Sequence, residues 1–128
     1  MSDSTPVVLI AEDNPGLARV LSFKFKTCGF APIVCGDGQL AWEAFQSNTP
    51  VAIISDQEMP RMSGVELCRN VRSQDPIIPF ILVTGRQLEL STTGIVEELN
   101  ITKIFGKPFS PADVIAAIND AIKEASVS

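Results

Sequence analysis

Histidine is absent from this sequence of 128 residues, and cysteine is scarce. Without an imidazole, the chain cannot form a His-dependent catalytic triad, an HExxH zinc site or a histidine base. The three cysteines, Cys28, Cys35 and Cys68, are odd in number and widely spaced. They therefore match neither a disulfide framework nor a zinc-binding pattern, and we expect buried thiols in a reducing cytosol.

Targeting segments and excess positive charge are missing too. The first six residues lack the basic and apolar regions of a signal peptide, and no apolar run approaches the roughly 20 residues of a membrane span. Ten Lys and Arg face fifteen Asp and Glu, which gives a net charge of −5. Because no basic patch can release phosphate counterions, we expect a protein that binds neither nucleic acids nor anionic membranes. Since no targeting segment or membrane span is found, we expect it in the cytoplasm.

The composition that remains is that of a globular domain, with 45% hydrophobic and 20% charged residues. A chain of this length buries well over half of its unfolded surface. We expect a single domain over residues 1–128, with its core within 7–125 and flexible ends at 1–6 and 126–128. Trp42 and the seven phenylalanines are expected in that core.

Short apolar runs alternate with segments of helical periodicity. The runs predict strands at residues 7–11, 31–35, 51–56, 77–83 and 101–105. The run that ends at Asp56 is apolar on both faces, which is typical of a central parallel strand. It stops at Met59-Pro60.

Capping residues indicate where the helices begin and end. The expected N-caps are Asn14, Asp37, Ser63 and Ser110, with Pro15 and Pro111 suited to the first helical position. Gly29 and Asn100 can take the left-handed conformation that ends a helix. The segment 87–99 is the weakest predicted helix because it combines poor helix formers with Gly94, so we expect it to be short or mobile.

Five strands alternating with five helices predict an α/β fold, a three-layer (βα)5 doubly wound parallel sheet with right-handed crossovers. In the flavodoxin-like strand order 2-1-3-4-5, the first and third strands are neighbours at the switch point. The carboxyl ends of all strands then lie at one edge. The side chains expected at that edge are Glu12, Asp13, Asp56, Thr84 and Lys107.

Three crowded carboxylates favour a hard divalent cation such as Mg²⁺, which prefers oxygen ligands and often binds together with phosphate. Asp56 is then placed to act as a nucleophile that forms an acyl phosphate. The cation and Lys107 would offset the charge on the phosphoryl oxygens, and the Thr84 hydroxyl and nearby backbone N–H groups would bond to them. Any one of these residues alone has a structural explanation, but four independent strand ends carry them together.

The set resembles the receiver domains of response regulators in bacterial-type two-component signalling. The resemblance covers residues 7 to about 125 and rests on Glu12-Asp13, on Asp56 followed by Met59-Pro60 and Gly64, on Thr84-Gly85, and on Lys107-Pro108-Phe109. It implies that Asp56 accepts a phosphoryl group from a phosphohistidine on a histidine kinase or histidine phosphotransfer protein. A surface around the fourth helix and fifth strand would then change and engage a possible downstream protein target.

The resemblance also implies a role for each matching residue. Asp13, Asp56 and the backbone carbonyl of Glu58 would bind Mg²⁺ or Mn²⁺, with Glu12 acting through water. Thr84 would move toward the phosphoryl group, Lys107 would pair with it, and the Lys107–Pro108 peptide bond would be cis. Such a domain phosphorylates and dephosphorylates itself and is not a dedicated enzyme.

One position departs from the family pattern, and two others are variable within the family. Ile104 stands at the switch position that is usually aromatic in the family, with Phe105 one place later, which puts the coupling to Thr84 in question. Glu58 and Arg86 occupy the positions with which the family tunes the phosphoryl lifetime. We hypothesise that their side chains face each other across the pocket and shield it from water.

Three alternative functions share part of this pattern. Haloacid-dehalogenase-like phosphatases also use an aspartate nucleophile, but they place it on the first strand in a D-x-D motif whose second aspartate is required. Asp56-Gln57-Glu58 resembles that motif only superficially, since its third residue is glutamate and it follows the third strand. A flavodoxin-like FMN site is disfavoured because Glu12-Asp13 would repel a phosphate. A receiver-like protein-interaction module that works without phosphorylation is the remaining alternative. No output domain is expected after Ser128, so a stand-alone regulator, a phosphorelay shuttle and an excised receiver all stay open.

Overall fold

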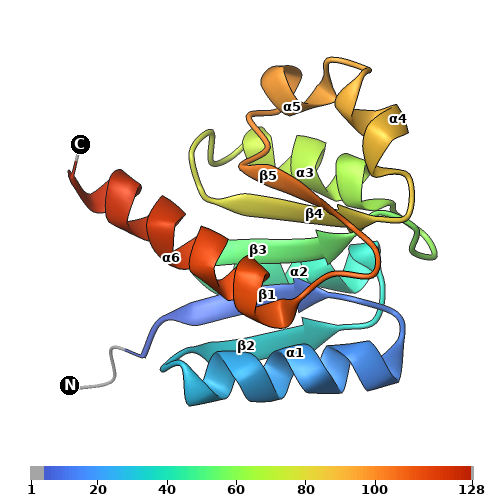
Figure 1. The fold of residues 1–128 in the computed structure, drawn as a ribbon. Helices are drawn as coiled ribbons and strands as arrows, with labels where there is room; N and C mark the ends of the chain where they lie inside the picture. The colour runs from blue at the N-terminus through green and yellow to red at the C-terminus, as the bar shows by residue number, and fades with distance from the viewer. Residues whose placement is uncertain (1–4, 128) are drawn as a thin grey trace.

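The structure is a computed structural model that describes residues 5–127, with the backbone alone for residues 126 and 127. Five parallel strands form one sheet in the order β2-β1-β3-β4-β5 (Figure 1). The strands are β1 Val7–Ala11, β2 Ala31–Cys35, β3 Ala52–Asp56, β4 Phe80–Thr84 and β5 Lys103–Gly106. The predicted α/β fold and strand order are confirmed.

Helices cover both faces of the sheet (Figure 1). On one face pack α1 (Pro15–Thr27) and α6 (Pro111–Val127), and on the other α2 (Gly38–Ser47), α3 (Gly64–Arg72), α4 (Gln87–Ser91) and α5 (Ile95–Glu98). The alternation of strand side chains explains the two cores: Ile10 packs with Phe25 of α1, whereas Leu9 packs on the opposite face with Leu67 of α3. A central strand buried on both faces therefore carries its last residues to one edge.

Three of the predicted N-caps, Asn14, Asp37 and Ser63, form the expected side-chain hydrogen bonds. Asn14 Oδ1 accepts a hydrogen bond from Leu17 N at 3.0 Å, and Asp37 Oδ1 accepts one from Leu40 N at 2.8 Å. Ser63 and Glu66 form a reciprocal capping box at the start of α3. Gly29 and Asn100 both have positive φ, 91° and 51°, as expected for the residues that follow α1 and the 87–99 segment.

Three strands have boundaries that differ from the sequence prediction. β3 begins one residue later, at Ala52, and β4 and β5 each end one residue later, at Thr84 and Gly106. β4 begins at Phe80 instead of residue 77, because Asp75 Oδ1 holds the backbone N–H groups of Ile77 and Ile78 in a turn and Pro79 has no N–H to give the sheet. β5 runs from Lys103 to Gly106 and begins two residues later than predicted. The apolar runs continue through turns that hydrogen bonding excludes from the strands.

The segment 87–99 is two short helices instead of one. Gly94, with φ of 80°, stands between α4 and α5 in a conformation that other residues rarely adopt. The described residues therefore contain six helices, not the expected five. None of them is long and apolar enough to cross a bilayer.

Two residues expected in the core lie at the surface. Phe23 is 64% exposed because it lies two positions from the buried Leu21 and Phe25, on the outer face of α1. Cys28 is exposed at the C-cap of the same helix, whereas Cys35 and Cys68 are buried as predicted. Of the ends expected to be flexible, residues 1–4 and 128 lie outside the described residues.

Candidate functional site

The strand register brings the predicted site residues to one edge of the sheet. Ala11 pairs with Ser55, Asp56 with Val83, and Thr84 with Gly106, so the last residues of β1, β3, β4 and β5 stand side by side. Glu12 follows β1 and Lys107 follows β5 directly. Parallel pairing thus collects side chains that are far apart in the sequence.

Three carboxylates meet at this edge. Glu12, Asp13 and Asp56 each offer one oxygen, and these oxygens lie within 4.8 Å of one another. Glu12 and Asp56 are buried, whereas Asp13 is exposed. Glu12 Oε2 accepts a hydrogen bond from Asn14 N at 3.1 Å, which ties this carboxylate to the start of α1.

Asp56 is held from one side only. Its Oδ2 lies 3.0 Å from Lys107 Nζ in an ion pair in which Asp56 is 3% exposed and Lys107 33%. Its Oδ1 is buried and has no hydrogen-bond partner among the described residues. A buried carboxylate oxygen without a partner is costly, so a ligand at this position would stabilise the site.

Burial dominates the electrostatics of the pocket. It raises the pKa of Asp56, which the hydrogen bond and charge of Lys107 offset only in part, and the charges of Glu58 and Asp13 raise it further. Burial likewise raises the pKa of Glu12. For Lys107, burial lowers the pKa, but the hydrogen bond and negative charge of Asp56 outweigh that effect and the pKa is raised. The pocket therefore disfavours the ionised forms of Asp56 and Glu12.

A hard divalent cation fits this pocket. All three clustered side chains offer carboxylate oxygens, the ligands that Mg²⁺ and Mn²⁺ prefer, and one of those oxygens is buried without a partner. Such a cation would also offset the repulsion among the three carboxylates. The carboxylates present therefore suit the divalent cation that the sequence predicts.

Thr84 and Glu58 are joined by a hydrogen bond that the sequence analysis did not predict. The buried Thr84 donates its hydroxyl proton to Glu58 Oε2 at 2.9 Å and accepts a hydrogen bond from Arg86 N at 3.0 Å. The Arg86 side chain is 73% exposed, and its Nε lies 3.7 Å from Glu89 Oε1, three positions along the chain. Glu58 and Arg86 thus have different partners, and the hypothesis that they face each other across the pocket and shield it from water stays a prediction.

Ile104, at the predicted switch position, is aliphatic and buried. Ile104 packs in the core with Leu82 and Leu99, whereas Phe105 is half-buried on the other face of β5, where Lys103 Nζ lies 4.9 Å from its ring centroid. The side chain at position 104 thus belongs to the sheet core, and the neighbouring aromatic does not replace it there.

Two glutamines form hydrogen bonds near the site that the sequence did not predict. Gln87 Nε2 donates to the backbone carbonyl of Ile104 at 3.0 Å and links α4 to β5, while its Oε1 lies against Gly106. A glycine within a strand indicates a close approach of this kind and was the one available signal. Gln57 Oε1 accepts from Val65 N at 2.8 Å and ties the loop after β3 to α3; no sequence signal marks it.

Backbone features complete the edge. The Lys107–Pro108 peptide bond is cis, as the resemblance implied. Gly64, the first residue of α3, lies so close to the end of β3 that a Cβ there would come within 2.5 Å of the Asp56 carbonyl oxygen. A glycine is needed at that position for the helix to start beside the acidic pocket.

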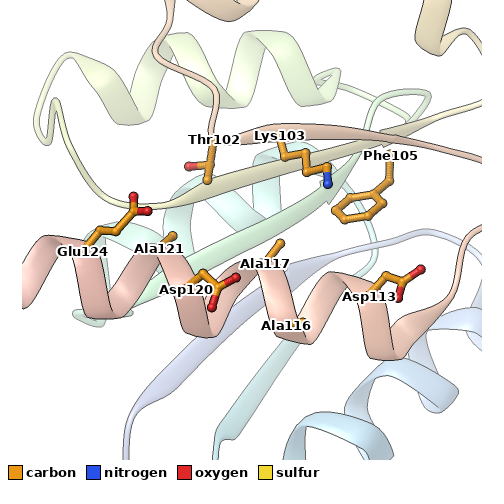
Figure 2. Close-up of a pocket in the computed structure, with 9 residues that line it drawn as sticks. All are labelled: Thr102, Lys103, Phe105, Asp113, Ala116, Ala117, Asp120, Ala121 and Glu124. Carbon is orange, nitrogen blue, oxygen red and sulfur yellow. The ribbon is translucent and has the colours of Figure 1, made fainter.

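A separate hollow of about 470 Å³ runs between β5 and α6 (Figure 2). Phe105 and Lys103 line it from the strand, and alanine and acidic side chains line it from the helix. None of its lining residues belongs to the acidic pocket, so this hollow is not part of the site.

Comparison with known proteins agrees with this geometry. Residues 8–119 match the family described as the response regulator receiver domain. The chain belongs to this family. It is a receiver domain of the two-component response regulator type. It is 33% identical over 116 residues to the sensory transduction protein RegX3 of Mycolicibacterium smegmatis, and the match covers 91% of this chain and 50% of RegX3. It is 28% identical over 118 residues to the DNA-binding response regulator MtrA of the same organism, covering 91% of this chain and 50% of MtrA.

Solved receiver domains share the fold. The receiver domain of the Francisella response regulator 1452 has a TM-score of 0.85 and 26% identity, covering 94% of this chain and 98% of that one. The receiver domain of the Pseudomonas aeruginosa sensor histidine kinase PA1611, solved with magnesium coordinated in its active-site cleft, has a TM-score of 0.79 at 22% identity, covering 94% and 99%. The chain spans about half the length of the curated relatives it matches.

Proposed function

We propose that this receiver domain accepts a phosphoryl group from a phosphohistidine onto Asp56 in a Mg²⁺-dependent reaction and thereby switches a protein-binding surface. The observation that carries the proposal is the Asp56 carboxylate, buried with one oxygen on Lys107 and the other without a partner beside two further acids. A structural ion pair alone would leave no reason for the acidic cluster.

In the transfer, an oxygen of Asp56 attacks the phosphorus and forms a P–O bond while the P–N bond of the donor breaks, and its electron pair stays on the imidazole nitrogen. Lys107 pairs with the phosphoryl oxygens, and the Thr84 hydroxyl donates a hydrogen bond to one of them. Asp13, Asp56 and the backbone carbonyl of Glu58 would bind the cation, Mg²⁺ or Mn²⁺, with Glu12 acting through water. That cation would neutralise charge on the phosphoryl group.

The phosphoryl donor must be a separate group, because these 128 residues contain no histidine. We assign that role to a histidine kinase or a histidine phosphotransfer protein. A hollow of about 430 Å³ beside the site supports a protein donor: Leu17, Pro108 and Phe109 give it apolar walls, and Lys107 opens onto it. A donor that covers this hollow brings its phosphohistidine next to Asp56.

We further propose that this domain acts in the cytoplasm and is not itself a nucleic-acid-binding surface. The three free cysteines, with Cys28 exposed, suit a reducing compartment. The net charge of −5 disfavours contact with a phosphate backbone. Any DNA binding by a longer protein would belong to residues outside this chain.

Incubation with acetyl phosphate and Mg²⁺, followed by intact-mass spectrometry and peptide mapping, tests the proposal. We expect the mass of one phosphoryl group on Asp56, its loss in Asp56→Asn or with EDTA, and slow loss over time as the domain dephosphorylates itself. Asp120→Asn, an exposed acid on α6, serves as the matched control and is expected to label normally. Absence of labelling in the unaltered protein would favour an interaction module that works without phosphorylation.

A further inference from the structure

The hydroxyl of Thr84 is engaged at both of its ends. It donates its proton to Glu58 Oε2 and accepts a hydrogen bond from Arg86 N, at 2.9 and 3.0 Å. Thr84 is buried at the end of β4, whereas Glu58 is exposed in the loop after β3. The hydrogen bond therefore joins the end of β4 to the loop after β3, beside the Asp56 pocket.

A hydroxyl group has a single proton to donate. In the proposed phosphorylated state, Thr84 gives that proton to a phosphoryl oxygen on Asp56, and in the structure it gives it to the Glu58 carboxylate. Both acceptors are anionic oxygens, and the hydroxyl cannot serve both. We propose that Glu58 is a positioning residue that holds Thr84 in the unphosphorylated arrangement and competes with the phosphoryl group for its proton. This inference rests on the proposed phosphorylation of Asp56.

The surroundings of Glu58 support competition. None of the ion pairs among the described residues includes Glu58: Arg61 pairs with Asp37, and Arg86 pairs with Glu89. The Glu58 carboxylate thus has no close ion-pair partner among the described residues, and a carboxylate is a strong acceptor for a hydroxyl. Its negative charge also opposes a phosphoryl group nearby, so the hydrogen bond and the charge must be separated experimentally.

The first experiment tests the Thr84–Glu58 hydrogen bond, called the tether below, without any phosphoryl donor or metal. Nuclear magnetic resonance of the Thr84 methyl group and its three-bond couplings reports the side-chain rotamer. We expect a single rotamer in the unaltered protein, averaging among rotamers in Glu58→Ala, and a retained rotamer in Glu58→Gln, whose amide oxygen can still accept the bond. Glu97→Ala, an exposed acid of α5, is the charge-matched control and is expected to leave Thr84 unchanged.

The second experiment measures binding of trifluoroberyllate, a phosphoryl analogue, with Mg²⁺. Removing the competitor in Glu58→Ala is expected to tighten binding by about 3- to 10-fold, the range for the net contribution of one ordinary hydrogen bond, because Glu58 is exposed to solvent. In a Thr84→Val background, which has no proton to compete for, the same change is expected to shift binding by less than about 2-fold.

The outcomes separate the tether from the proposed function. An unchanged Thr84 rotamer in Glu58→Ala, or an equal gain in affinity with and without the Thr84 hydroxyl, overturns the tether and leaves phosphorylation standing. If Glu58→Ala releases Thr84 but no variant binds the analogue or labels with acetyl phosphate, the hold on Thr84 is confirmed, whereas the competition and the proposed function both fail. Release of Thr84 together with a hydroxyl-dependent gain in affinity supports both.

Discussion

Replacing Gly64 by alanine tests whether the start of α3 is packed against the end of β3. The added Cβ would lie 2.5 Å from the Asp56 carbonyl oxygen, 2.5 Å from Leu82 Cδ1 and 3.1 Å from Gln57 Cα. Contacts of 2.5 Å are shorter than Cβ atoms tolerate. Leu82 can respond with a rotamer change, but the Asp56 carbonyl is backbone and can move only with the strand.

The expected cost follows from these contacts. Overpacking a tight site costs about 1–3 kcal/mol, and the two backbone contacts place Gly64→Ala at the upper end. Alanine recovers about 0.5–1 kcal/mol because it loses less backbone entropy than glycine on folding. We therefore expect a net loss of about 2 kcal/mol in the free energy of unfolding, a large share of the stability of a domain of this size.

Urea unfolding monitored by circular dichroism, with the m-value compared between variants, measures this loss. Gly36→Ala is the matched control, because a Cβ at Gly36 meets nothing within 4 Å and the residue has no positive φ. It is expected to stay within about 1 kcal/mol of the unaltered protein, on the stable side. If Gly64→Ala is as stable as Gly36→Ala, the close packing of α3 against Asp56 is refuted.

Two further predictions concern the pocket and its connection to β5. Burial raises the pKa of Asp56 and of Glu12, so each carboxyl group binds its proton more tightly in the folded protein than in the unfolded chain. Ionisation of either group therefore lowers the stability of the fold, and this loss disappears as the pH falls through the folded-state pKa. Asp56→Asn is therefore expected to stabilise the metal-free protein at pH 7, with a gain that shrinks in urea titrations at lower pH; a gain that grows on acidification contradicts the sign. Gln87→Ala removes the hydrogen bond to the Ile104 carbonyl and is expected to cost about 1 kcal/mol in urea unfolding. Gln39→Ala, whose side chain bonds only to the exposed Glu43, should change stability by less than about 0.5 kcal/mol, and equal effects would argue against the Gln87 link.

Local features of the chain were predictable because they depend on neighbouring residues. The caps at Asn14, Asp37 and Ser63 and the left-handed Asn100 act within a few positions of themselves, and each is present. The strand cores were also recognisable from continuous apolar runs. Their limits were not, because a strand ends where its partner's hydrogen bonds end, as at Pro79.

Surface and core could not be separated for every apolar residue. Phe23 has the hydrophobicity of a core side chain, but the direction in which α1 packs on the sheet places it outside. Gly94 was read as a weak point of one helix, whereas the structure uses its positive φ to turn between two. Both outcomes depend on how helices dock, which the local sequence does not encode.

By itself, the sequence determined the edge at which the site would lie and the residue types gathered there. Parallel strands with the same handedness of crossover bring every carboxyl end to one side, whatever the loops do. Which side chains pair depends on the folded structure: Lys107 pairs with Asp56 and Thr84 with Glu58, whereas Arg86 pairs with Glu89, three positions along the chain. The Thr84–Glu58 and Lys107–Asp56 pairs join residues that are 26 and 51 positions apart, so they depend on distances that exist only after the sheet has formed.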